Sequence, residues 1–330
     1  MQRIEVSPQD LASSRFGISP MIIVGHALRA LSGVHVHTMA RPWAEQVRDR
    51  YRELRRTVPS LDALIALFRP QGYNAAFTAP PPAGVDVTFA DELAVVRATP
   101  LATARAEIAE SLAGRPAPPP AVRAVLDSPD VVARFADALE ATWELVVAPD
   151  WPVFRAICER DVVVRAGQLA TRGWAHALDD LSPQVRWRSD GRYGHLELAR
   201  WPDDTARLDG RGLLFVPTVF GGLATYLHEP WPPAIVYAAR GVAALWESPA
   251  AGRSGALARL VGRSRAAILA ALEAPATTSQ LVGQLGMSLG GVGGHLAALR
   301  EAGLVSGVRA GREVRYRRTP LGDALVAAGG

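Results

Sequence analysis

Arginine is the residue type in this sequence most suited to binding chemistry, and it accumulates near the C-terminal end. The 330-residue chain has 36 basic and 32 acidic residues, and all 36 basic residues are arginine. Residues 263–318 carry a balance of +5, whereas the whole chain carries +4. Guanidinium groups bind phosphate oxygens through paired hydrogen bonds, so this excess is suited to contact with a polyanion. The alternative is a solvated basic surface without a partner. The arginines of the segment are Arg263, Arg265, Arg300, Arg309, Arg312, Arg315, Arg317 and Arg318.

Five elements are expected to position these arginines. SRAAILAALEAP predicts a helix that stops at Pro275, and TTSQLVGQLG predicts a second, capped by Thr277 and ended by Gly286. A third helix over 288–303 has Val292, Leu296 and Leu299 at helical spacing. Alternation on both sides of residues 310–311 indicates a two-stranded ribbon, and a short helix closes the chain. This order is typical of a winged helix-turn-helix.

The segment TTSQLVGQLGMSLGGVGGHLAALREAGLVSGVRAGREVRYRRTPLGDAL resembles the DNA-binding domain of the ArsR-type bacterial transcriptional regulators. The resemblance covers about 263–325 and is most specific from His295 to Val305 and in the ribbon that follows. It implies contacts with double-stranded DNA. The residues expected to make them are Thr278, Ser288, Gly290, Gly291, Gly293, Gly294, His295, Arg300, Arg309, Arg312, Arg315 and Arg317. Metal sensors of that family use paired cysteines in the helix before the recognition helix, and residues 277–287 contain none.

Four glycines occupy the first half of the expected recognition helix. An interior glycine costs a helix roughly 1 kcal/mol relative to alanine. In the resembled family, the positions of Gly291, Gly293 and Gly294 usually carry side chains that touch DNA. Either the bare backbone approaches DNA closely, or this chain has drifted to weak base readout. In both cases affinity would depend on the ribbon arginines, on backbone contacts and on DNA shape.

The first 250 residues predict a large, mostly helical domain with a small antiparallel sheet near its end, so the fold class is α+β. Ser7, Pro8 and Asp10 form a helix start. QVRWRSDGRYGHLELAR predicts a hairpin, and two further strands are expected in 211–220 and 233–240. Helices are expected near 20–31, 41–57, 60–68, 89–97, 101–113, 121–147 and 151–180.

The domains are expected at 1–250 and 263–330, joined by a linker or short helix over 251–262. RGLLFVPTVF and WPPAIVYAARGVAALW resemble an uncharacterised domain that often precedes winged helices in such regulators. That resemblance supplies no ligand.

No catalytic residue, metal ligand set or cofactor motif is evident, so an enzyme is not expected. His35 and His37 are two residues apart, but a metal site needs three or four ligands. Cys158 is the single cysteine and suits a small buried apolar position. No apolar run approaches the roughly 20 residues that span a bilayer, and a cytoplasmic location is expected.

Together these features predict a homodimeric DNA-binding regulator, a repressor, whose large N-terminal domain dimerises and senses a small-molecule effector. All eight tryptophans precede residue 247, where they suit either a ligand chamber or ordinary core positions. One alternative is a protein–protein interaction module whose winged helix has lost DNA binding. A further alternative is an N-terminal enzyme with a regulatory tail.

Overall fold

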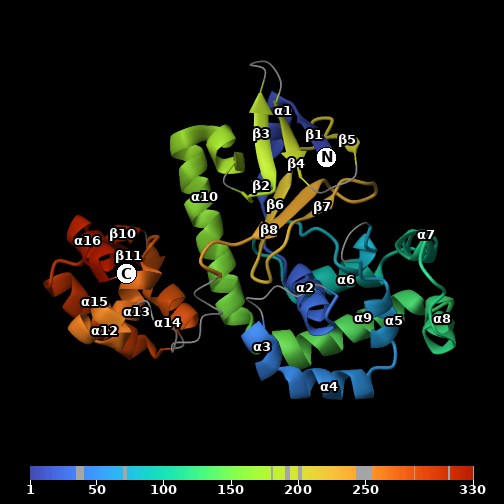
Figure 1. Cartoon of the computed structure of the whole chain (residues 1–330), viewed down its shortest axis with the longest axis horizontal. Helices are drawn as coiled ribbons and strands as arrows, with labels where there is room; N and C mark the ends of the chain where they lie inside the picture. Colours follow the sequence, from blue (N-terminus) through green and yellow to red (C-terminus); the bar gives the residue numbers. More distant parts are fainter. Residues whose placement is uncertain are drawn as a thin grey trace. The chain divides into compact units, whose positions relative to one another are not determined.

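The computed structural model describes residues 1–34, 41–69, 73–179, 181–189, 194–199, 203–242, 255–285, 287–310 and 313–329. The chain folds as two compact units, Met1–Trp246 and Glu247–Gly330 (Figure 1). His35, His37, Trp201, Trp246, Gly286 and Arg312 lie outside the described residues, as do the turn expected at Asp190–Gly191 and most of the linker.

Two four-stranded sheets lie in the first unit. The outer sheet has the order β3 (Val185–Ser189), β4 (Gly194–Leu198), β1 (Gln2–Val6) and β5 (Asp204–Arg207). The inner sheet has the order β2 (Arg15–Phe16), β6 (Leu214–Thr218), β8 (Ala234–Ala238) and β7 (Ala224–Tyr226). The expected hairpin is confirmed as β3 and β4, which pair from Val185↔Leu198 to Ser189↔Gly194.

The expectation of a small antiparallel sheet is wrong. In the inner sheet β6 runs parallel to both β2 and β8, and in the outer sheet β1 runs parallel to β5. Strands β6 and β8 consist almost entirely of apolar residues, because both faces of the inner sheet are covered by other elements. Phe215 and Tyr237 face a core shared with the outer sheet, while Leu214 and Val236 pack with Ile22 of α2 (Pro20–Leu31).

The helices of the first unit surround a larger second core. Their central member is α9 (Val131–Thr142), of which Phe135, Ala136 and Leu139 are fully buried. The others are α1 (Pro8–Ser13), α3 (Arg41–Gln46), α4 (Arg48–Thr57), α5 (Leu61–Ala66), α6 (Phe89–Arg97), α7 (Leu101–Leu112), α8 (Pro120–Leu126) and α10 (Trp151–Asp179), with a 3-10 turn at Ala76–Thr78 and a π-turn at Trp143–Val147.

Two expected helices are divided. The helix expected over 41–57 breaks at Val47, whose backbone is not helical. The one expected over 121–147 breaks at residues 127–130, where Pro129 disfavours a helical conformation at Ser128.

The prediction of a mostly helical chain with small sheets is confirmed.

The tryptophans that the structure describes pack into the two cores. Trp43 contacts the rings of Phe154 and Phe220, and Trp143 stacks on Phe89. Trp151 and Trp231 join the same helical core, whereas Trp174 and Trp187 pack at the core between the sheets. Cys158 is fully buried, as expected, and burial raises the pKa of its thiol.

The second unit contains α12 (Gly255–Val261), α13 (Arg263–Ala271), α14 (Thr278–Leu285), α15 (Leu289–Glu301) and α16 (Pro320–Gly329). Its small sheet has the order β10 (Val305–Ala310), β11 (Glu313–Arg318) and β9 (Ala276–Thr277). The expected ribbon is therefore present as β10 and β11. Helix α12 occupies part of the segment expected as a linker or short helix, and it packs on α13 and α16.

A buried carboxylate fixes the start of α2 in the first unit. Ser19 caps the helix by accepting the Ile22 N–H, and Glu92 of α6 accepts the Met21 N–H at 2.8 Å. Glu92 is 3 % exposed. Burial raises its pKa to about 7, although hydrogen bonds from Ser19 and Met21 oppose the shift.

The Glu92 carboxyl should make the stability of the first unit depend on pH. A pKa raised on folding gives stability that is complete below about pH 4.5 and is lost as the pH rises through 7. The loss should amount to roughly 3 kcal/mol, and Glu92→Gln should remove most of it. Urea unfolding between pH 4.5 and 8, followed by tryptophan fluorescence, measures this first unit because every tryptophan precedes residue 247. Parallel pH profiles for wild type and variant would contradict the assignment.

Candidate nucleic-acid interface

Helices α13, α14 and α15 enclose a small apolar core. Val292, Leu296 and Leu299 of α15 are buried against Ile268, Leu269 and Leu281, so the predicted helical face is confirmed. These contacts remove apolar surface from water, and this burial is the main source of stability in a unit of this size.

The helix start expected at Thr277 is confirmed, and Ser288 caps the next helix. Thr277 Oγ1 accepts the Gln280 N–H at 3.2 Å, and Gln280 Oε1 accepts the Thr277 N–H at 2.8 Å. Ser288 Oγ accepts the Gly291 N–H at 3.2 Å, which leaves the hydroxyl proton of this exposed residue able to donate. Thr278, the first residue of α14, is half-buried.

Helix α15 ends at the expected glycine. Gly303 has a φ of +70°, and the Leu304 N–H returns to the Leu299 carbonyl at 2.9 Å. This left-handed ending turns the chain directly into β10.

Beyond Leu289, the surface of α15 that faces away from the core carries few side chains. Its exposed residues are Leu289, Gly290, Gly294 and Ala297, followed by the pair Arg300 and Glu301. His295 is half-buried at the edge of this face. Few side chains are therefore placed to read bases from this helix.

Packing within the protein does not require the glycines of α15. A Cβ atom built on Gly290, Gly293 or Gly294 would meet no described atom within 4 Å. At Gly291 it would lie 3.0 Å from Ser288 Oγ. None of the four has a positive φ. The helix therefore carries the cost of these glycines without an internal structural need for most of them.

The hairpin sorts its arginines onto two faces. Arg315 and Arg317 lie on one face of β11, opposite Val308 and Ser306 of β10. Arg309 pairs with Val314 and thus lies on the other face, which also carries Tyr316. Arg309 and Arg317 are exposed and Arg315 is half-buried. The structure brings Arg315 and Arg317 together and separates them from Arg309.

One arginine of the basic segment turns inward. Arg318 Nη1 donates to the Leu269 carbonyl at 3.3 Å, and its Nε lies 2.7 Å from Asp323 Oδ1 of α16. This side chain joins α13, β11 and α16, so its charge is partly neutralised within the unit. Arg263 and Arg265 at the start of α13 are exposed.

Residues 263–308 match a family model described as a helix-turn-helix domain. The chain therefore contains a helix-turn-helix domain, which indicates a DNA-binding regulator. No curated protein and no solved structure matches the chain.

The described part of the chain holds neither a metal-binding cluster nor a membrane-spanning helix. Among the described residues, no group of three or more His, Cys, Asp or Glu side chains is arranged to hold a metal ion. No described helix combines the length and apolar character that crossing a membrane requires.

Replacing helix glycines with alanine should strengthen α15. Gly293→Ala and Gly294→Ala each remove a glycine penalty of roughly 1 kcal/mol without a steric conflict. Gly291→Ala is the matched control, because its Cβ would crowd the capping hydroxyl and its gain should be smaller. Hydrogen–deuterium exchange of the amides in 289–301, measured on the full chain, reports the effect. Unchanged or faster exchange in both variants would show that an unrecognised contact needs the glycines.

Proposed function

We propose that this protein is a transcriptional regulator that binds double-stranded DNA through an ArsR-type winged helix in its C-terminal unit. The observation that carries the proposal is the helix-turn-helix match over 263–308, followed by an arginine-rich hairpin. In this arrangement α15 is the recognition helix and β10–β11 is the wing. The excess positive charge of 263–318 supports it, since phosphate contacts supply most of the affinity of such proteins.

The bare face of α15 determines how DNA would be bound. With Gly290, Gly294 and Ala297 outward, the backbone itself can approach the duplex closely. The capped N-terminus of α15 has a partial positive charge and free N–H groups that suit a phosphate. Arg315 and Arg317 would contact the backbone of the DNA from the wing, and Arg309 would add a contact near its tip. Arg312 lies outside the described residues, and its contact with DNA is a proposal that rests on the resemblance alone.

The proposal includes a homodimer that acts as a repressor on a two-fold symmetric site. A single winged helix covers only one half-site, and two-fold operators match two-fold proteins. The first unit, with its large core, would supply the dimer contact and respond to an effector by changing the spacing of the two recognition helices.

The second candidate function is protein–protein interaction through the same unit. The glycine-rich face of α15 favours it, because a recognition helix with few outward side chains can read few bases directly. The exposed Leu289, Val308 and Leu321 would then contribute apolar contact.

Arginine substitutions test the DNA proposal. We expect Arg315→Ala combined with Arg317→Ala to weaken binding to a fragment from upstream of the protein's own gene by several-fold. The slope of log affinity against log salt should fall by about 1 for each phosphate interaction that a substitution removes. Arg309→Ala and Arg312→Ala should show smaller effects of the same kind. Arg50→Ala, an exposed position on α4, is the control for net charge and should leave binding unchanged. Fluorescence anisotropy at about 50 and 200 mM salt measures all of them.

A deletion completes that test. A chain ending at Gly262 keeps the whole first unit and lacks the helix-turn-helix. Full binding by this deletion, or wild-type binding by the arginine variants, would overturn the proposal. Absence of DNA binding in the wild type, together with a stable complex with another protein, would support the second function.

Glycine variants test whether the backbone of α15 contacts DNA closely or whether the helix contributes little to binding. If the backbone of α15 contacts DNA, Gly290→Ala and Gly294→Ala should lower affinity even though they stabilise the helix. If the helix contributes little, the same variants should bind as well as wild type or better. The anisotropy assay and the exchange measurement on the same samples separate the two outcomes.

A further inference from the structure

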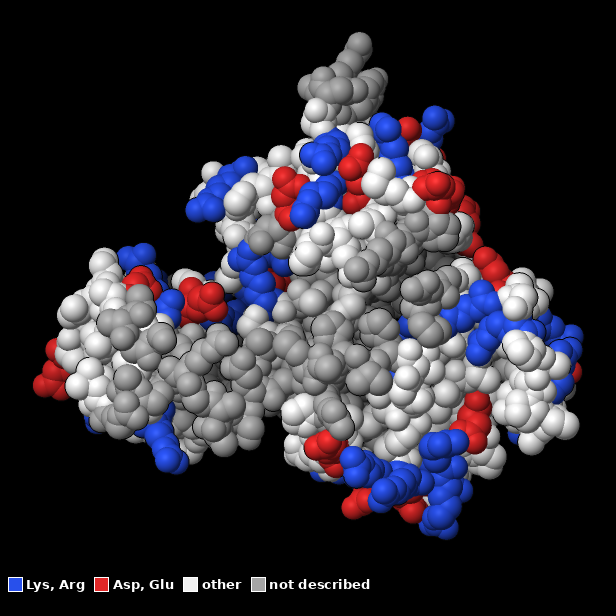
Figure 2. Space-filling view, in the orientation of Figure 1, with Lys and Arg blue, Asp and Glu red and all other residues white. Residues whose placement is uncertain are grey.

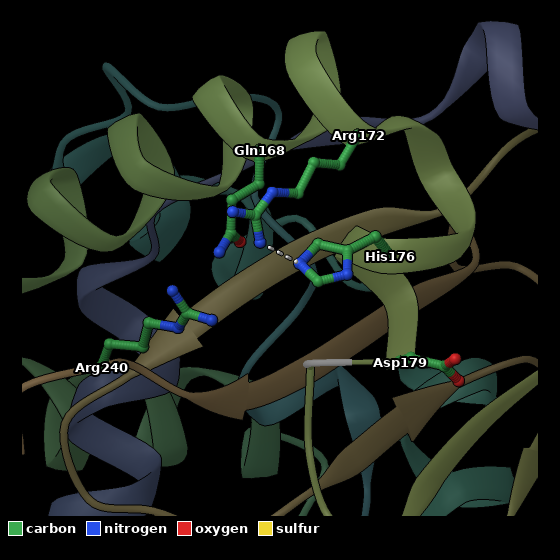
Figure 3. Close-up of a pocket in the computed structure, with 5 residues that line it drawn as sticks. All are labelled: Gln168, Arg172, His176, Asp179 and Arg240. Atoms are coloured by element: carbon green, nitrogen blue, oxygen red, sulfur yellow. Dashed lines mark hydrogen bonds between the residues drawn. The ribbon is translucent and has the colours of Figure 1, made fainter.

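We draw no further inference here: the strongest candidate, the hollow of about 400 Å³ at the break of α10 near Gly173 (Figure 3), carries none because it opens widely to solvent, is lined by the acidic Asp179 as well as the exposed Arg172 and His176, and includes an Arg240 that interacts elsewhere, while Arg52, Arg55 and Arg56 over α4 (Figure 2) already pair with carboxylates.

Discussion

A buried carboxylate on α10 holds the two halves of the first unit together. Asp161 accepts hydrogen bonds from Arg165, from the Tyr237 hydroxyl at 2.7 Å and from the Arg240 N–H. Arg165 also lies over the Tyr237 ring, with Cζ 4.6 Å from its centroid. A charge taken out of water is tolerated only with partners of this kind, and losing one of them typically costs about 3–5 kcal/mol. Burial and the neighbouring Asp161 raise the pKa of Tyr237, which keeps its hydroxyl a donor. The inner sheet and α10 are thus joined through the carboxylate of Asp161.

The C-terminal unit follows a different principle. Its stability rests on local signals and a compact apolar core, since two capped helix starts and a left-handed ending define α14 and α15. The core side of α15 is ordinary, whereas its outer face has few side chains and a backbone with more conformational freedom. The stability of the helix is therefore supplied almost entirely by Val292, Leu296 and Leu299. The residues on its outer face are not needed for folding and can serve contact with a partner.

Local features could be predicted from the sequence, and distant ones could not. The predicted caps at Ser7 and Thr277 are present because each depends on a residue three positions away. Strand direction in the inner sheet depends on which segments meet, so runs near 214 and 234 revealed strands without revealing that they are parallel. The separation of Arg309 from Arg315 follows from strand alternation and could have been predicted once the register was known. Arg172 and His176 have helical i, i+4 spacing, but nothing in the sequence placed Arg240 beside them.

The length of α10 has a structural consequence. Before its break, residues 151–172 form a helix roughly 33 Å long, with Phe154 and Ile157 in the helical core near its start. Beyond the break, Trp174 and Leu178 pack between the sheets. One continuous element therefore contributes side chains to both hydrophobic cores of the first unit. The positive φ of Gly173 lets the chain change direction between them while the segments on either side stay helical.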